Sequence, residues 1–252
     1  MKAFSVIGTT KTGKTTTIEN IIKELVRRGF SVGSIKEIHY EKFAIDTEGT
    51  NTYRHAAAGA KVVTARGYYE TNILYSKKLS VEEILKFYDQ DYVVMEGISD
   101  YNLPVIICAS DTADIENYKE KDFFNRVFAI SGVVSNTEKD YDGIPVINAE
   151  EKAGELTDLI IEKVFNILLD YSPECCSECG YSCRELASRI LSGKSKRQDC
   201  RIGQAKIVLK IDGENIGINP FVQNILIDTI KALVSNLKGY RKSGKIDITI
   251  NR

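Results

Sequence analysis

The chain has 252 residues, and its 34 Lys and Arg against 35 Asp and Glu give a formal net charge of −1 at pH 7. This balance excludes a global field that would draw the protein to nucleic acid or anionic lipid. Its apolar runs fall far short of the roughly 20 residues of a membrane-spanning helix, and the N-terminus enters a strand-like run without a signal segment. We therefore expect a cytoplasmic protein that binds neither nucleic acid nor membrane.

The first 170 residues alternate short β-rich runs with helical patterns, which predicts an α/β nucleotide-binding domain over residues 1–170 with a mostly parallel sheet. Its first helix repeats apolar residues at helical spacing from Ile18 to Val26. The expected strands are Phe4–Gly8, Ser31–Lys36, Lys61–Ala65, Tyr92–Glu96, Pro104–Cys108, Val127–Val134 and Pro145–Ile147. The expected helices are Lys14–Arg28, Thr50–Ala58, Val81–Tyr88 and Glu150–Leu169.

The sequence changes character after residue 170, which predicts two further small domains. Residues 171–203 form a cysteine-rich segment, within which Arg184–Leu191 has the pattern of an amphipathic helix. Residues 204–252 are expected to form a ββαβ unit that is too small to be very stable alone. Its expected elements are the strands Lys206–Ile211 and Asn215–Ile218, the helix Pro220–Leu237 and the strand Lys245–Ile250.

The strongest motif is a phosphate-binding loop at residues 8–15, whose residues fit the pattern G-x4-G-K-[ST] between a strand and a helix. The glycines let main-chain N–H groups turn toward an anion, and the helix start adds its positive end. We expect Lys14 to reach the β- and γ-phosphates and the Thr15 hydroxyl to ligate Mg²⁺. The expected nucleotide-binding residues of this loop are Gly8, Thr9, Thr10, Lys11, Thr12, Gly13, Lys14, Thr15 and Thr16.

A carboxylate at the end of another strand should hold or orient the magnesium ion. Glu96 ends the apolar run Tyr92–Glu96 and is followed by Gly97, so it is one candidate. Asp46 lies in a polar, glycine-containing loop of the kind that senses a γ-phosphate, and it is the other. Each residue also has a simpler interpretation, since Glu96 fits an ordinary strand-end carboxylate and Asp46 fits a solvated loop.

Five of the six cysteines cluster between residues 175 and 200, which suggests a metal site in a reducing compartment. Counted from Cys176, the spacing through Cys179, Cys183 and Cys200 is C-x2-C-x3-C-x16-C. Three close thiolates and a distant fourth suit a [4Fe–4S] cluster, with Cys175 as a substitute first ligand. Zinc, which prefers paired C-x2-C knuckles, and metal-free reduced thiols are the alternatives.

Several further blocks, combined with the phosphate loop, resemble the MobB family of molybdopterin-guanine dinucleotide biosynthesis accessory proteins. The resemblance covers roughly residues 1–168. Its order and spacing are more specific than those of a phosphate loop alone. The blocks are Gly8–Thr16, Val32–Lys36 with His39, Asp46–His55, Ala57–Ala60, Val94–Gly97 and Gly143–Val146. The cysteine segment in turn resembles the small Fe–S domain of corrinoid proteins and electron-transport subunits, in which the middle spacing is one residue longer.

The MobB resemblance implies a dimeric GTP-binding protein with Mg²⁺ and weak GTPase activity. It would assist a molybdopterin guanylyltransferase or a molybdo- or tungsto-enzyme apoprotein. Positions matching Lys36, Asp46 and Glu96 would line the nucleotide pocket beside the loop. The chain departs from the family pattern at Glu37 and Asn51, which affects hydrolysis more than binding.

Three questions stay open from the sequence. The first is whether the nucleotide is GTP or ATP, since Asn136 after the strand Val127–Val134 only loosely matches the guanine-reading motif Asn-Lys-x-Asp. The second is whether the chain is instead a nucleotide-gated iron–sulfur electron-transfer or cluster-handling ATPase. The third is whether its ββαβ tail recruits a partner enzyme. Any hydrolysis should be slow, because no arginine finger or catalytic glutamine can be identified.

Overall fold

A computed structural model describes most of the chain, in two compact units, residues 1–167 and residues 168–252. No helix in the described part combines the length and apolar composition needed to cross a bilayer. The described residues are 1–168, 179–200, 207, 209–211, 214–216, 218, 220–241, 246 and 248.

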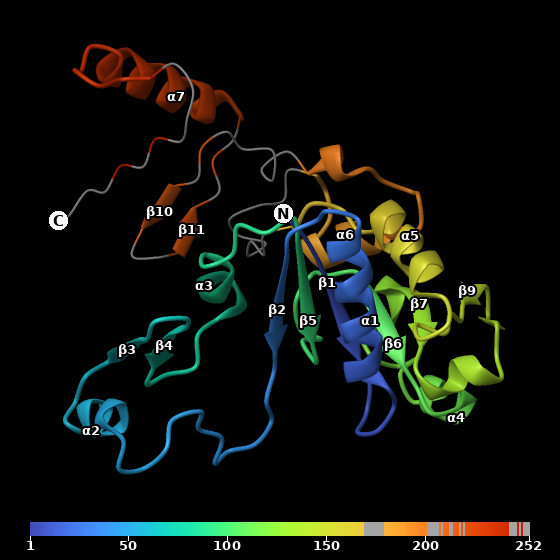
Figure 1. The fold of residues 1–252 in the computed structure, drawn as a ribbon. Coiled ribbons are helices and arrows are strands. Elements are labelled where there is room, and N and C mark those ends of the chain that lie inside the picture. The colour runs from blue at the N-terminus through green and yellow to red at the C-terminus, as the bar shows by residue number, and fades with distance from the viewer. Residues whose placement is uncertain are drawn as a thin grey trace. The chain divides into compact units, whose positions relative to one another are not determined.

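The first unit is built on a five-stranded sheet with the strand order β2-β5-β1-β6-β7 (Figure 1). Every pairing in it is parallel, so the carboxyl ends of all five strands meet at one edge. This arrangement confirms the expected α/β class with a mostly parallel sheet. The strands are β1 (Lys2–Ile7), β2 (Val32–Lys36), β5 (Tyr92–Glu96), β6 (Val105–Cys108) and β7 (Val127–Ser131).

Helices cover both faces of this sheet, and β1 shows how its residues divide between them. Ala3 and Ile7 pack into two apolar clusters that also contain residues of α3 and α4. Phe4 and Val6, also buried, point to the opposite face because side chains alternate along a strand. On that face α1 and α5 lie side by side (Figure 1). These helices are α1 (Lys14–Arg27), α3 (Val81–Leu85), α4 (Thr112–Glu116) and α5 (Ala153–Lys163).

A long insertion between β2 and α3 carries α2 (Asn51–Ala57) and a hairpin of β3 (Val62–Arg66) and β4 (Thr71–Tyr75). Thr50 caps α2 by accepting a hydrogen bond from the Tyr53 N–H. Figure 1 shows the hairpin and α2 standing away from the sheet, beyond its edge strand β2. The insertion is therefore a surface element attached to the nucleotide-binding fold.

The second unit contains two short helical segments, a hairpin and a longer helix among its described residues. The N-cap Ser182 starts α6 by accepting a hydrogen bond from the Glu185 N–H, close to the expected start at Arg184. β10 pairs antiparallel with β11, as the first part of the ββαβ pattern predicts, but most of the expected strand Lys245–Ile250 lies outside the described residues. The elements are α6 (Cys183–Leu191), η3 (Arg197–Asp199), β10 (Leu209–Ile211), β11 (Glu214–Ile216) and α7 (Pro220–Val234).

Three expected elements of the first unit were too long. The helix predicted over Val81–Tyr88 ends at Leu85. The strand predicted over Val127–Val134 ends at Ser131, because Gly132 adopts a φ of 85° and the chain continues as the 3₁₀ segment η2 (Val133–Asn136). The helix predicted over Glu150–Leu169 spans only Ala153–Lys163, and its cap Val164 is extended. Apolar residues continue past each of these three ends, so hydrophobicity alone did not mark them.

Other short elements were missed or displaced. The strand β4 and the helix α4 were not predicted, although Asp111 caps α4 through the Asp114 N–H. The strand expected at Pro145–Ile147 is one residue earlier and pairs as β9 (Ile144–Pro145) with β8 (Asp140–Tyr141). All are five residues or shorter, below the length at which periodicity is informative.

Glu24 and Arg28 connect α1 to α5. The Arg28 guanidinium bonds Glu24 at 2.7 Å, Asp158 of α5 at 2.5 Å and the Gly154 carbonyl at 2.9 Å. Hydrogen bonds from Arg27 and Arg28 lower the pKa of the Glu24 carboxyl to about 2. Because the folded pKa lies below the ordinary value, this stabilisation is complete above about pH 4.5 and is lost as the pH falls toward 2.

We expect Glu24→Gln to lower the thermal unfolding midpoint at pH 7, with the difference from wild type shrinking as the pH drops from 5 toward 2. Thermal unfolding followed by circular dichroism across that range measures the difference. Glu19→Gln is the matched control, since its pair with Lys23 on the same helix is long, at 4.0 Å, and exposed. An equal loss in both variants, or a loss from Glu24→Gln that does not depend on pH, would contradict the account.

Candidate functional site

The phosphate loop leaves β1 at Ile7 and enters α1 at Lys14, and the backbone requires both motif glycines. A Cβ at Gly8 would lie 2.3 Å from the Cys108 carbonyl oxygen of β6. Gly13 has a φ of 89°, in the left-handed region that side chains disfavour. The loop is therefore folded tightly against the carboxyl end of the sheet.

The loop is also fixed to the end of β7, through Gly132. A Cβ at Gly132 would lie 2.1 Å from the Thr12 carbonyl oxygen, and that oxygen accepts a 3.3 Å hydrogen bond from the Val133 N–H. One turn into α1, the Thr17 hydroxyl lies 3.3 Å from the Ser131 hydroxyl. Sequence reasoning missed this contact, although a glycine directly after an apolar strand was a visible signal.

Positive charge and main-chain donors gather at the mouth of the loop. The Lys14 ammonium donates to the Thr9 carbonyl, which holds it over the loop. Gly13, the N-cap of α1, has no side chain to cap the helix, and the first helical bond runs from the Thr17 N–H to the Gly13 carbonyl. The N–H groups of the first turn, including Thr15, are thus left for an external anion at the positive helix end.

Glu96 and Lys36, both predicted from the sequence, lie together at the same edge of the sheet. They are register partners at the ends of β5 and β2, and the Lys36 ammonium lies 2.8 Å from the Glu96 carboxylate. Glu96 is also paired with Val6 of β1, two residues before the loop begins at Gly8. The Glu96 side chain is only 14% exposed, so the ion pair forms a partly sheltered polar end to the strand.

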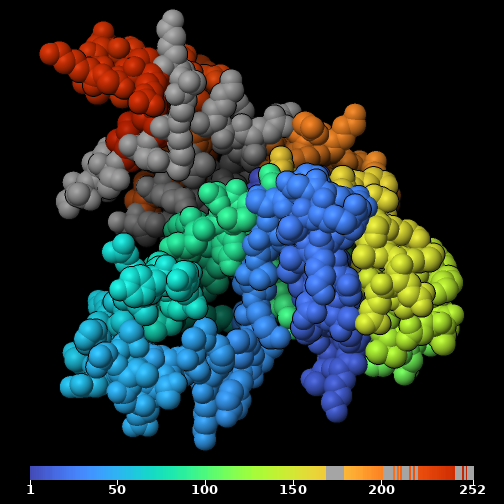
Figure 2. Space-filling model, in the orientation of Figure 1, coloured from blue at the N-terminus to red at the C-terminus, as the bar shows by residue number. Residues whose placement is uncertain are grey.

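Asp46 lies elsewhere, in the loop before α2. It accepts hydrogen bonds from the Thr47 N–H and the Thr50 hydroxyl, and the Thr50 bond is the main reason its pKa is lowered. It lines a cavity of about 770 Å³ formed by the insertion together with Lys36, and no phosphate-loop residue lines that cavity. Figure 2 shows the insertion and the phosphate loop as separate projections. A γ-phosphate contact for Asp46 therefore stays a prediction.

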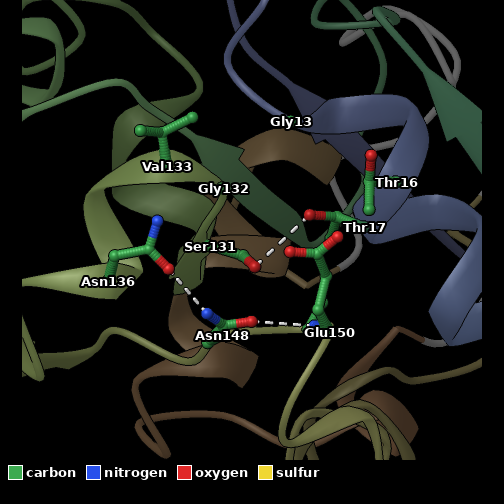
Figure 3. Close-up of a pocket in the computed structure, with 10 residues that line it drawn as sticks. Gly13, Thr16, Thr17, Ser131, Gly132, Val133, Asn136, Asn148 and Glu150 are labelled. Carbon is green, nitrogen blue, oxygen red and sulfur yellow. Dashed lines mark hydrogen bonds between the residues drawn. The ribbon is translucent and has the colours of Figure 1, made fainter.

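A second cavity, of about 150 Å³, opens directly beside the phosphate loop (Figure 3). It runs from Gly13 and the first turn of α1 to η2 and to the segment Asn148–Glu150. Asn136, the expected base-reading residue, lines it and accepts a 2.8 Å hydrogen bond from Asn148. Asp140, which the Asn-Lys-x-Asp comparison required, instead bonds the Gly143 N–H in the β8–β9 turn.

The cysteines divide between the two units. Cys108 is fully buried at the end of β6, where burial raises its pKa to about 12, as expected for a structural thiol. Cys179 donates to the Tyr181 carbonyl at 3.4 Å, Cys183 begins α6 and Cys200 follows η3. Cys175 and Cys176 lie outside the described residues. Among the residues that are described, no three metal-ligating side chains gather into one group.

We expect Gly132→Ala to weaken nucleotide binding and lower stability, because its methyl group would overlap the Thr12 carbonyl. Gly143→Ala is the matched control: Gly143 has a similar φ of 81° but nothing within 4 Å of the added carbon. Both variants carry backbone strain of about 1 kcal/mol or more, and the clash should cost Gly132→Ala a further ~1–3 kcal/mol. Urea unfolding measures the stability of both variants, and nucleotide titration measures their affinity. Equal losses of stability and affinity in the two variants would contradict a tight contact between Gly132 and Thr12.

Two known proteins resemble this chain in sequence, and a solved structure resembles it in fold. A Methanocaldococcus jannaschii protein described as a putative molybdopterin-guanine dinucleotide biosynthesis adapter protein is 28% identical over 261 residues, covering 100% of this chain and 99% of that protein. A Bacillus subtilis protein described as a probable adapter of the same pathway is 25% identical over 150 residues, which cover 58% of this chain and 84% of that protein. The crystal structure of Bacillus subtilis MobB shares the fold, with a TM-score of 0.54 at 23% identity over 66% of this chain and 99% of that one.

The family model of molybdopterin guanine dinucleotide synthesis protein B matches residues 3–131. That match is just over half of the chain, and it contains the phosphate loop together with Lys36 and Glu96. By this match, the chain belongs to the MobB family.

Proposed function

We propose that this protein is a GTP-binding adapter of molybdopterin-guanine dinucleotide biosynthesis, with slow Mg²⁺-dependent hydrolysis. The observation that carries the proposal is the complete phosphate loop, Gly8–Thr15, held at the carboxyl end of a parallel sheet in the MobB fold. The relatives described above are named as adapters of that pathway. In this proposal, the protein binds GTP and acts through an enzyme partner.

The residues at the loop suit a triphosphate with magnesium. The Thr15 hydroxyl and the Glu96 carboxylate are hard oxygen donors of the kind Mg²⁺ prefers, and they would hold or orient the ion. When bound, the ion would neutralise charge between the terminal phosphates. Lys14 supplies a fixed ammonium from the loop, and Lys36, paired with Glu96, keeps that carboxylate in place.

Slow turnover follows from what lines the two cavities. Neither cavity has an arginine or glutamine among its lining residues in the described part of the chain. Phosphoryl transfer to water depends on such groups to stabilise the developing charge or to orient the attacking water. The isolated protein should therefore bind GTP far better than it hydrolyses it, and a partner or a second copy would complete the site.

An exposed apolar surface on the insertion supports the adapter role. Six apolar side chains that line the 770 Å³ cavity are between 39% and 72% exposed. A contiguous apolar surface of this kind typically marks a protein–protein contact. We infer that it serves the molybdopterin guanylyltransferase, a molybdo- or tungsto-enzyme apoprotein, or the second subunit of a homodimer. The six residues are Ile38, Tyr40, Phe43, Ile45, Tyr53 and Ile73.

We expect Lys14→Ala to weaken Mg²⁺-GTP binding by about 10- to 100-fold, because the ammonium that neutralises the terminal phosphates is lost and a charge-assisted contact is worth about 1.5–3 kcal/mol. Lys23→Ala is the matched control, since it removes an equal charge from an exposed position of α1 outside the loop. Isothermal titration calorimetry of both variants measures the affinity. Unchanged GTP affinity in Lys14→Ala would remove the basis of the proposed function.

We further infer that the cysteine-rich segment holds a [4Fe–4S] cluster, on the spacing of its thiols. We expect anaerobically purified full-length protein to be brown and to contain about four iron and four sulfide per chain. Cys183→Ala should lose most of that content, whereas Cys108→Ala, at the buried structural thiol, should keep it. A colourless protein with one zinc per chain would establish the alternative, and a protein without metal would refute both.

A further inference from the structure

Two amide side chains in the 150 Å³ cavity, Asn136 and Asn148, are coupled in a fixed direction. Asn148 is buried, 7% exposed, and its side-chain oxygen accepts hydrogen bonds from the main-chain N–H groups of Glu150 at 2.8 Å and Glu151 at 3.2 Å. Main-chain N–H groups can only donate, so the oxygen of Asn148 must face them. Its NH₂ group therefore faces Asn136.

This direction determines which end of Asn136 is presented to the cavity. The Asn148 NH₂ donates to the Asn136 side-chain oxygen at 2.8 Å, so the NH₂ of Asn136 points the other way. Figure 3 shows this nitrogen turned away from Asn148. Among the described residues, no hydrogen-bond acceptor is paired with it. Asn136 is an exposed residue of the cavity lining. Its unpaired donor is therefore open to a ligand, in an orientation that two main-chain groups set.

The cavity is placed to receive the nucleoside end of a bound triphosphate. It begins at Gly13 and Thr16, next to the loop that would hold the phosphates, and ends at the two asparagines. The carboxylate of Glu150, also in its lining, would repel a phosphate there. At about 150 Å³ the cavity is smaller than pockets that enclose whole small molecules, so it would take one end of the ligand.

Purine bases differ at the group such a donor would meet. Guanine carries an acceptor oxygen at C6, whereas adenine carries an amino group there, and both have an acceptor at N7. A fixed N–H group can donate to the C6 oxygen of guanine but not to the C6 amino group of adenine, because two donors placed face to face leave both unpaired. A donor directed only at N7 would not discriminate between the two bases.

We propose that Asn136, oriented by Asn148, selects a 6-oxopurine nucleotide over a 6-aminopurine one in this cavity. The inference rests on the proposed triphosphate binding and adds the residues that choose the base. Both asparagines lie beyond residues 3–131, the span matched by the family model, so this selection belongs to the part of the chain that follows β7.

The substitution Asn148→Asp reverses the hydrogen bond with almost no change of shape. The new carboxylate would still accept from the Glu150 and Glu151 N–H groups, but its second oxygen would also be an acceptor. The Asn136 amide would have to rotate to donate to it, and its oxygen would then face the cavity. In the full-length protein with Mg²⁺, we expect wild type to prefer GTP over ATP by about 10-fold or more, and Asn148→Asp to prefer ATP.

Equilibrium titration with GTP, ITP and ATP separates the possible outcomes. ITP keeps the C6 oxygen but lacks the 2-amino group, so it should bind wild type within about threefold of GTP. Thr137→Asp, at an exposed residue outside the cavity lining, adds the same charge beside Asn136 and should leave the GTP-to-ATP ratio unchanged. Asn136→Ala should bring that ratio close to one, and unfolding midpoints confirm that each variant is folded.

Two results would overturn the inference while leaving the proposed function intact. One is equal binding of GTP and ATP by wild type, and the other is a GTP-to-ATP ratio in folded Asn148→Asp that matches wild type. If wild type bound no purine triphosphate at all, the proposed function itself would fail and the inference would fail with it. A ratio that moves toward ATP in Asn148→Asp and not in Thr137→Asp supports the inference.

Discussion

The candidate nucleotide site depends on a backbone contact between segments far apart in the sequence. Gly132 directly follows β7 and packs against the main chain of Thr12 in the phosphate loop. The space between Gly132 and Thr12 has no room for a side-chain carbon. The Val133 N–H donates to the Thr12 carbonyl across the same contact. Main-chain atoms on both sides therefore fix this part of the loop.

That contact also links the two halves of the proposed ligand site. In the proposed function, the loop supplies main-chain N–H groups, the Lys14 ammonium and the Thr15 hydroxyl for phosphates and magnesium. The same turn after Ser131 leads into η2, which places Asn136 at the far end of the adjoining cavity. One glycine thus lies between the phosphate loop and the segment that carries Asn136. The insertion beyond β2 presents the exposed apolar surface that we propose for a partner.

Features that rest on local pattern were predicted well. The phosphate loop, the strand ends that bring Lys36 to Glu96, and the amphipathic α1 follow from motifs and periodicity within a few neighbouring residues. The contact of Gly132 with the loop and the pairing of Asn148 with Asn136 join distant segments, and no local pattern encodes them. Asn148 had one visible signal, an amide just before a helical pattern, but its role in orienting another amide appears only in three dimensions.

Hydrogen exchange read by mass spectrometry tests the central claim most directly, namely that one nucleotide spans the phosphate loop and the cavity after β7. The protein would be compared with and without saturating GTPγS and Mg²⁺. The account predicts added protection in peptides covering residues 8–17, 132–136 and 148–151 together, with an ATP analogue protecting the last two segments less. Protection of the phosphate loop alone, or of none of the three segments, would contradict it.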